Sequence, residues 1–105
     1  MPHFNRCLML TPQTIYKYEL PVEGRFVLAL PENAQVLTVQ IQHGKPVLWA
    51  LLCPGEGAVP RHFEIFGTGL QVPHLDDGSA RHYVNTFQVN GGLVFHLFEL
   101  TNQPA

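Results

Sequence analysis

Two arginine–histidine pairs are the residues whose types and spacing most readily suggest binding chemistry. Arg61-His62 and Arg81-His82 each stand at the start of a predicted strand, on either side of a long predicted loop. If the two strands share a sheet edge, these side chains form a cationic pocket for a phosphate or a carboxylate. Because the spacing does not fix the strand register, two exposed pairs without mutual contact are the favoured interpretation.

A glycine-rich turn, Gly67-Thr68-Gly69, follows the first of these strands. Backbone amides at Gly67 and Gly69 would assist the binding of an anion. The third glycine, the following helix and the lysine of known phosphate-binding loops are missing. We therefore expect these glycines mainly to turn the chain at a strand end.

Catalytic and metal-binding patterns are not evident in the sequence. The spacing of the histidines matches neither a zincin helix nor a zinc finger. The only serine, Ser79, lies in the predicted loop and not in a nucleophile elbow. Glu99 is expected at a solvent-facing strand end. We expect no catalytic residue, no metal ion and no cofactor. The histidines considered are His3, His43, His62, His74, His82 and His96.

Short apolar or alternating runs, separated by glycine and proline, predict an all-β chain. In the clearest run, residues 35–42, Leu37, Val39 and Ile41 alternate with polar residues, which predicts one buried face. His43-Gly44 then leads into a second strand at residues 45–52, whose apolar run from Val47 to Leu52 predicts a central strand and completes a β-hairpin. Further strands are expected at Thr14–Leu20, Arg25–Leu30, Arg61–Phe66, His82–Val89 and Leu93–Leu100.

These elements define the expected architecture. About seven short strands indicate an antiparallel sandwich or a small barrel-like roll. The stretch from Leu70 to Arg81 is expected to be a surface loop. Residues 1–105 are expected to form a single domain, with residues 1–14 as a peripheral N-terminal extension and residues 101–105 as a C-terminal tail.

Composition limits the classes of partner. A net charge of −2 without any cluster of lysine or arginine argues against direct nucleic-acid binding. No apolar run approaches the roughly 20 residues of a membrane-spanning helix. Cys7 and Cys53 are read as two reduced thiols, which favours the cytoplasm. Charged residues make up only 13% of the chain, so we expect a homo-oligomer, with a dimer favoured.

Six aromatic residues in the strands predicted after residue 60 exceed what one small core needs. We expect some of them to form a contact surface for another chain. Those concerned are Phe63, Phe66, Tyr83, Phe87, Phe95 and Phe98.

Four phrases together resemble an uncharacterised family of small proteins, about 100 residues long, from bacteriophages and bacterial genomes. They are Ile15–Leu20, Leu48–Leu51, Phe66–Gly69 and Gly92–Glu99, so the resemblance covers roughly residues 15–99. It implies no activity and no site residues. A phage-like origin implies a compact accessory protein that acts on host machinery in the host bacterial cytoplasm.

The leading hypothesis is therefore a non-enzymatic binding protein. It would be a phage-encoded inhibitor of a host defence system, of the anti-CRISPR type, that contacts a host protein or protein complex. The alternative is an oligomeric sponge that sequesters a small anionic, nucleotide-like ligand through Arg61, His62, Arg81 and His82. A metal-dependent hydrolase and a virion component are further alternatives.

Overall fold

The structure, a computed structural model, describes residues 12–22, 24–89 and 91–101. In these residues the regular structure consists of strands alone, which confirms the predicted all-β class. Two of the predicted strands, at residues 35–42 and 45–52, have the predicted bounds. The strands are β1 (Thr14–Glu19), β2 (Gly24–Pro31), β3 (Gln35–Gln42), β4 (Lys45–Leu52), β5 (Ala58–Gly67), β6 (Ala80–Gln88) and β7 (Val94–Thr101).

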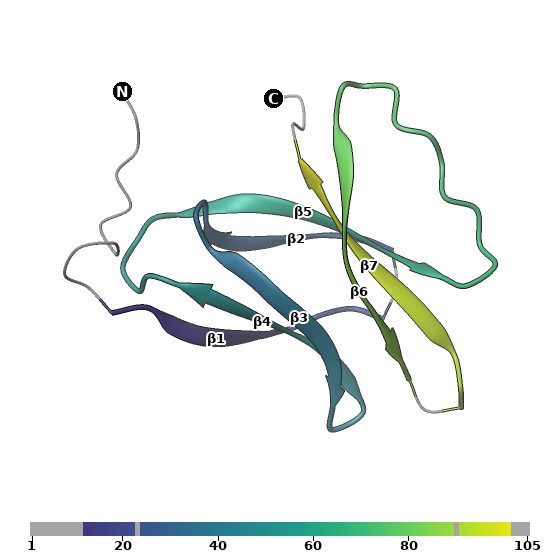
Figure 1. Cartoon of the computed structure of the whole chain (residues 1–105), viewed down its shortest axis with the longest axis horizontal. Coiled ribbons are helices and arrows are strands. Elements are labelled where there is room, and N and C mark those ends of the chain that lie inside the picture. The colour runs from purple at the N-terminus through teal and green to yellow at the C-terminus, as the bar shows by residue number, and fades with distance from the viewer. Residues whose placement is uncertain (1–11, 23, 90, 102–105) are drawn as a thin grey trace.

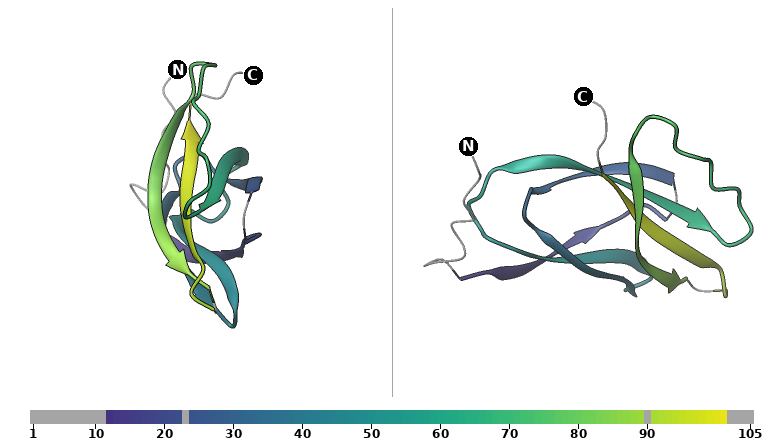
Figure 2. Two further views of the ribbon diagram at one scale, coloured as in Figure 1. Left: turned by 90° about the vertical axis from the view of Figure 1, so that its right-hand side faces the viewer. Right: turned by 45° about the horizontal axis from the view of Figure 1, so that its top comes forward.

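The strands form two antiparallel sheets that lie face to face (Figure 1). The three-stranded sheet has the order β1-β4-β3, and the four-stranded sheet has the order β2-β5-β7-β6. Figure 2 shows the two layers from the side. The described chain measures 45 × 36 × 15 Å, so its shortest dimension leaves room for only two sheets about 10 Å apart. The fold is an open sandwich and not a closed barrel.

The β3–β4 hairpin forms where the sequence predicts it. His43 and Gly44 link Gln42 to its partner Lys45, and their φ angles are 52° and 79°. Two residues with positive φ make the tight turn whose twist matches that of the paired strands. β4 is the middle strand of its sheet, as its apolar sequence predicts.

A β-bulge in β3 overturns part of the predicted alternation. Val39 is fully buried and Ile41 packs against the core, as expected. Leu37, however, is 40% exposed, and Val36 packs against the core in its place. The register shifts between Val36 and Thr38, so the extra residue changes which face the strand presents.

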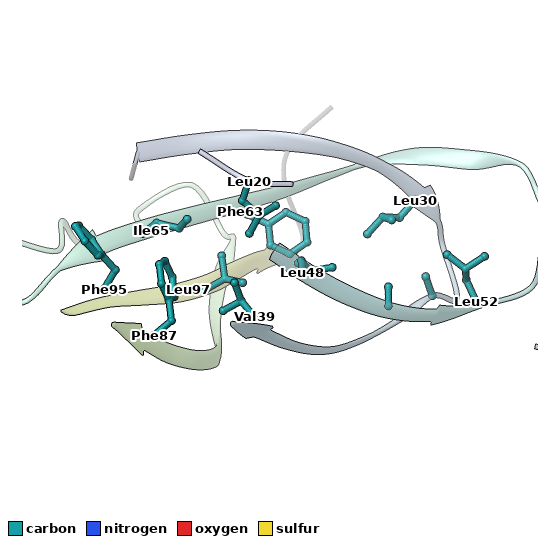
Figure 3. Packing of buried hydrophobic residues seen from close by; sticks show 12 residues of the cluster. Leu20, Leu30, Val39, Leu48, Leu52, Phe63, Ile65, Phe87, Phe95 and Leu97 are labelled. Atoms are coloured by element: carbon teal, nitrogen blue, oxygen red, sulfur yellow. The ribbon is translucent and has the colours of Figure 1, made fainter. Parts of the chain in front are cut away.

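Leucine and phenylalanine side chains fill the space between the sheets (Figure 3). Phe63 on β5 and Leu97 on β7 are fully buried and face Leu48 and Val39 from the other sheet. Phe26 stacks on Phe63 with the ring centroids 5.3 Å apart. Burial of this apolar surface is the main force that holds the two sheets together.

The two sides of the sandwich differ. β3 and β6 pack closely and close one side, whereas β1 and β2 make no contact of comparable extent on the other. Tyr18, Phe26 and Leu28 therefore lie partly buried at the rim of the core, on the two strands of the open side. This asymmetry determines which sheet edges remain accessible.

The connection between β5 and β6 has no regular structure, which confirms the predicted surface loop. Asp77 accepts hydrogen bonds from the side chain and the backbone amide of Ser79, and Gly78 has a φ of 85°. These hydrogen bonds, the side-chain one first, lower the pKa of the Asp77 carboxyl. The aspartate thus initiates a turn.

The predicted terminal segments fall mainly outside the described residues. Thr14 pairs with Leu52 and Thr101 pairs with Ala80, so both belong to the sheets and not to an extension or tail. Residues 1–11 and 102–105 lie outside the described residues. Along the described ranges, no helix is long and apolar enough to cross a membrane.

The prediction of reduced thiols is wrong at Cys53. This residue is buried at the end of β4 and is disulfide-bonded. Cys7 lies outside the described residues. The pattern of two cysteines could not distinguish these states because spacing along the chain does not fix the distance between sulfur atoms.

Candidate binding surface

The aromatic residues of the second half of the chain divide between the two faces of the four-stranded sheet. Phe63, Phe87 and Phe95 belong to the core. Phe66, Tyr83 and Phe98 lie on the opposite, outer face, since strand alternation turns them away from the core. We call these three residues the aromatic face.

A β-bulge at Val84 determines the face of the sheet on which Tyr83 lies. The register shifts between Tyr83, which is paired with Phe98, and Asn85, which is paired with Leu97. Without the extra residue Tyr83 would face the core side, as Phe87 does, because odd positions of a regular strand share one face. The bulge therefore turns Tyr83 outward, whereas Asn85, beyond the bulge, faces inward with Phe87.

The aromatic face is a packed group. The Tyr83 and Phe98 rings meet edge to face, with centroids 5.7 Å apart. Phe66 meets the same Phe98 ring at 6.1 Å, again edge to face. The guanidinium carbon of Arg81 lies 5.4 Å from the centroid of Phe66. Such contacts hold the rings in fixed orientations although Tyr83 is 59% exposed.

The charges beside these rings are paired. Nε of Arg81 donates to the Glu64 carboxylate at 2.7 Å, and both side chains are largely buried. A second nitrogen of Arg81 donates to the Pro73 carbonyl at 3.0 Å and so ties the β5–β6 loop to β6. The aromatic face therefore adjoins a neutral ion pair and not a free cation.

A row of hydrogen bonds crosses the sheet beside the rings. Nε2 of His96 lies 2.8 Å from the Thr68 hydroxyl, which itself donates to the Val94 carbonyl. Nδ1 of His96 lies 2.9 Å from the Thr86 hydroxyl, and Thr86 lies 2.7 Å from the Tyr83 hydroxyl. The row spans from the end of β5, across β7, to β6 and fixes the polar end of Tyr83.

A hollow of about 410 Å³ lies at the end of β5 and the start of β7. Its lining is mainly apolar, with exposed leucines from two turns. Thr68 belongs both to this lining and to the hydrogen-bonded row, so the hollow adjoins the Thr68 end of that row. The lining residues are Gly67, Thr68, Leu70, Gly92, Leu93, Val94 and Phe95.

The structure does not bring the two predicted arginine–histidine pairs into one pocket. Strand register and alternation place Arg61 and His82 toward one side of the sheet, and His62 and Arg81 toward the other. Leu100 is the direct partner of both His62 and Arg81 and separates them. His82 lies 2.8 Å from the Thr101 hydroxyl.

Arg61 is held in a largely buried ion pair and is not available to bind a ligand. It makes two hydrogen bonds to the Glu99 carboxylate, at 2.7 and 2.9 Å, and donates to the carbonyls of Pro31 and Ala34. The Arg61 and Glu99 side chains are only 15% and 16% exposed. Glu99 is therefore an inward-facing acid, and its predicted solvent-facing position is wrong.

The predicted glycine turn has its own role. Thr68 and Leu70 donate their amides to the Val94 and Gly67 carbonyls, so these two amides are already engaged. A Cβ on Gly67 would lie 3.4 Å from the Phe95 ring and 3.5 Å from Leu70. Gly67 thus helps to keep the hollow open, while Gly69, with a φ of 90°, turns the chain.

The sequence did not show the roles of several side chains of this surface. Glu64, Thr86 and His96 carry no recognisable motif, and their roles follow from cross-strand pairing. Pairing of β6 with β7 brings Thr86 opposite His96, and pairing of β5 with β7 brings Phe66 opposite His96. Among the residues that the structure describes, no group of three or more His, Cys, Asp or Glu side chains could hold a metal ion. His3 lies outside them.

The fold and this surface define a small two-sheet β-sandwich with an aromatic, charge-paired outer sheet face. Residues 11–105 match the family described as a domain of unknown function, DUF7352. The chain belongs to this family, which agrees with the expected membership of an uncharacterised family. No curated protein and no solved structure matches the chain.

Proposed function

We propose that this protein is a non-enzymatic binding protein that recognises a protein partner through the aromatic face and the adjoining hollow. The observation that supports this proposal most strongly concerns Tyr83, which is 59% exposed. Its ring nevertheless packs against the Phe98 ring, and its hydroxyl is hydrogen-bonded to the Thr86 hydroxyl. An aromatic side chain fixed before binding loses little entropy in a complex, which is typical of the residues that dominate protein interfaces.

The charge distribution supports a protein partner. Glu64 neutralises Arg81, and the hydrogen-bonded row beside the rings consists of hydroxyls and the imidazole of His96. Interface centres are depleted in unpaired charge and enriched in tyrosine, phenylalanine and arginine. The hollow beside Thr68 fits an apolar side chain of the partner, since its lining is mainly apolar.

The finer parts of the proposal rest on the sequence. A phage-encoded inhibitor of a host defence system would use such a surface to occupy its target in the host cytoplasm. The alternative, a sponge for an anionic nucleotide-like ligand, requires cationic groups on one surface. In the structure Arg61 and Arg81 are each neutralised by a carboxylate, which favours the protein partner.

Affinity capture with matched variants tests the proposal. Tyr83→Ala removes the anchor, and Leu93→Lys places a charge at the hollow. Tyr16→Ala removes a partly exposed tyrosine from the other sheet and is the control. We expect a host protein that the wild type and Tyr16→Ala retain and that both surface variants lose. Equal capture by all four proteins would contradict the proposal, as would a specific rise in melting temperature with nucleotides alone.

A further inference from the structure

The edge strands of the two sheets differ in how they are protected from pairing with another chain. Exposed backbone N–H and C=O groups make an edge strand a template for a further strand, and proteins usually block it with charges, bulges or covering segments. The sheet orders make β1 and β3 the edges of one sheet, and β2 and β6 the edges of the other.

Three of these edge strands have a feature that hinders pairing with another chain. β3 has the bulge at Leu37, and its Val39 backbone is covered by the Asn85 side chain. β6 has the bulge at Val84 and packs against β3. β1 is short and carries charged Lys17 and Glu19 on its outer face.

β2 differs from the other three edges. It runs for eight residues, its pairing with β5 has no register shift, and its proline, Pro31, stands only at the end. Its one charged residue is Arg25. Val27 is 52% exposed, and Phe26 and Leu28 are only partly covered at the rim of the core. Among the described residues no strand pairs with the outer edge of β2 (Figure 1).

We propose that β2 pairs antiparallel with β2 of a second copy of this chain, so that the two four-stranded sheets join into one continuous sheet. A two-fold axis through Val27 places that residue opposite its own copy, and Phe26 opposite Leu28. Arg25 then stands opposite Ala29, so like charges do not face each other. The pairing supplies partners for the edge backbone and covers the apolar rim.

The composition favours a second copy over a foreign strand. Charged residues are 13% of the chain, about half of the roughly 25% usual in soluble domains. In a symmetric strand pair, each residue near the two-fold axis lies opposite itself or opposite another residue of the same strand, so like charges there would repel. The segment Phe26–Leu30 is entirely apolar and avoids this repulsion. The proposal is independent of the aromatic face, which lies nearer the opposite edge of the sheet.

Sedimentation equilibrium of the full chain over a range of concentrations provides the test. The wild type is expected to be a dimer. Val27→Lys sets two lysines opposite each other, and Ala29→Lys sets a lysine opposite Arg25 at two places. Each should raise the dimer dissociation constant at least about tenfold. Ile15→Lys is the control, because Ile15 is similarly exposed, at 56%, on the edge strand of the other sheet, and it should leave the constant unchanged.

Hydrogen exchange locates the interface without a variant. On dilution of the wild type, amides of residues 24–31 should exchange faster, and those of residues 80–88 should not. If a lysine variant loses its β-sheet circular dichroism, it has unfolded and cannot report on the interface. Hydrogen exchange of the wild type then tests the proposal by itself. If the wild type is a monomer, the proposal is wrong, and β2 would then be available to pair with a strand of another protein. A dimer that neither variant weakens, with no dilution effect on residues 24–31, would overturn it too.

Discussion

The side-chain amide of Asn85 makes hydrogen bonds to both backbone groups of Val39, as a neighbouring strand would do. Oδ1 of Asn85 accepts a hydrogen bond from the Val39 amide at 2.7 Å, and Nδ2 donates to the Val39 carbonyl at 2.8 Å. The two residues are on different sheets, so this pair links the sheets where β3 and β6 close the sandwich. Asn85 follows the bulge at Val84 and faces inward with Phe87, two residues further along β6.

Replacement of Asn85 by alanine should destabilise the protein. The Val39 amide and carbonyl would lose their partners at a partly buried position, which costs about 1–3 kcal/mol of unfolding free energy. Urea denaturation measures the loss. Gln88→Ala, an exposed position on the same strand, is the control and should change the free energy by less than about 0.5 kcal/mol. Equal stability of the two variants would show that the pair contributes nothing.

Loss of Arg61 should have a larger effect. Arg61→Met leaves the inward-facing Glu99 without its cation and removes one hydrogen-bond donor from each of the Pro31 and Ala34 carbonyls. Breaking a buried ion pair in this way costs about 3–5 kcal/mol, and Glu99→Leu in the same chain should restore part of that loss.

Lys45→Met is the matched control for the Arg61 variant. It breaks the exposed contact between Lys45 and Glu19, whose charged atoms are 3.6 Å apart. Pairs of this kind contribute about 0–1 kcal/mol. If the double variant of Arg61 and Glu99 is less stable than Arg61→Met, the account of an uncompensated carboxylate is wrong.

The hairpin turn offers a test with effects of both signs. Gly44→Ala should lower stability by about 1 kcal/mol because alanine disfavours a φ of 79°, although no atom lies within 4 Å of its Cβ. His43→Asn should raise stability by a few tenths of a kcal/mol, since asparagine tolerates positive φ better. Gly57→Ala, at a glycine without positive φ, is the control. Thermal unfolding followed by circular dichroism gives all three values.

Alkaline pH should weaken the fold through Tyr18. Burial, and then the neighbouring Tyr16, raise the pKa of the Tyr18 hydroxyl above its ordinary value of 10.0. The unfolded chain therefore loses this proton at lower pH than the folded chain. The contribution of Tyr18 to stability is complete below pH 10 and is lost as the pH rises through the folded-state pKa.

Melting temperatures between pH 8 and pH 11 test this dependence. Tyr18→Phe should lose less stability above about pH 10 than the wild type does. Tyr83→Phe, which removes an exposed tyrosine hydroxyl, is the matched control and should follow the wild type. A Tyr18→Phe curve parallel to the wild-type curve would assign the alkaline loss to other groups.

The strands and the hairpin could be predicted from the sequence because their causes are local. Alternation of side chains sets strand type, and a two-residue turn containing Gly44 sets the β3–β4 register. The surplus of aromatic residues could also be predicted, as could the glycine turn at Gly67. Local pattern did not show which aromatics lie outside the core.

The bulges and the ion pairs depend on which strands become neighbours. An extra residue at Val84 reverses the face of Tyr83 relative to Phe87, and nothing in the alternation of β6 marks it. Arg61 meets Glu99 and Arg81 meets Glu64 only after β5, β6 and β7 have aligned in register. A shift of one residue would turn each charge to the other face, so these partners are properties of the assembled sheet.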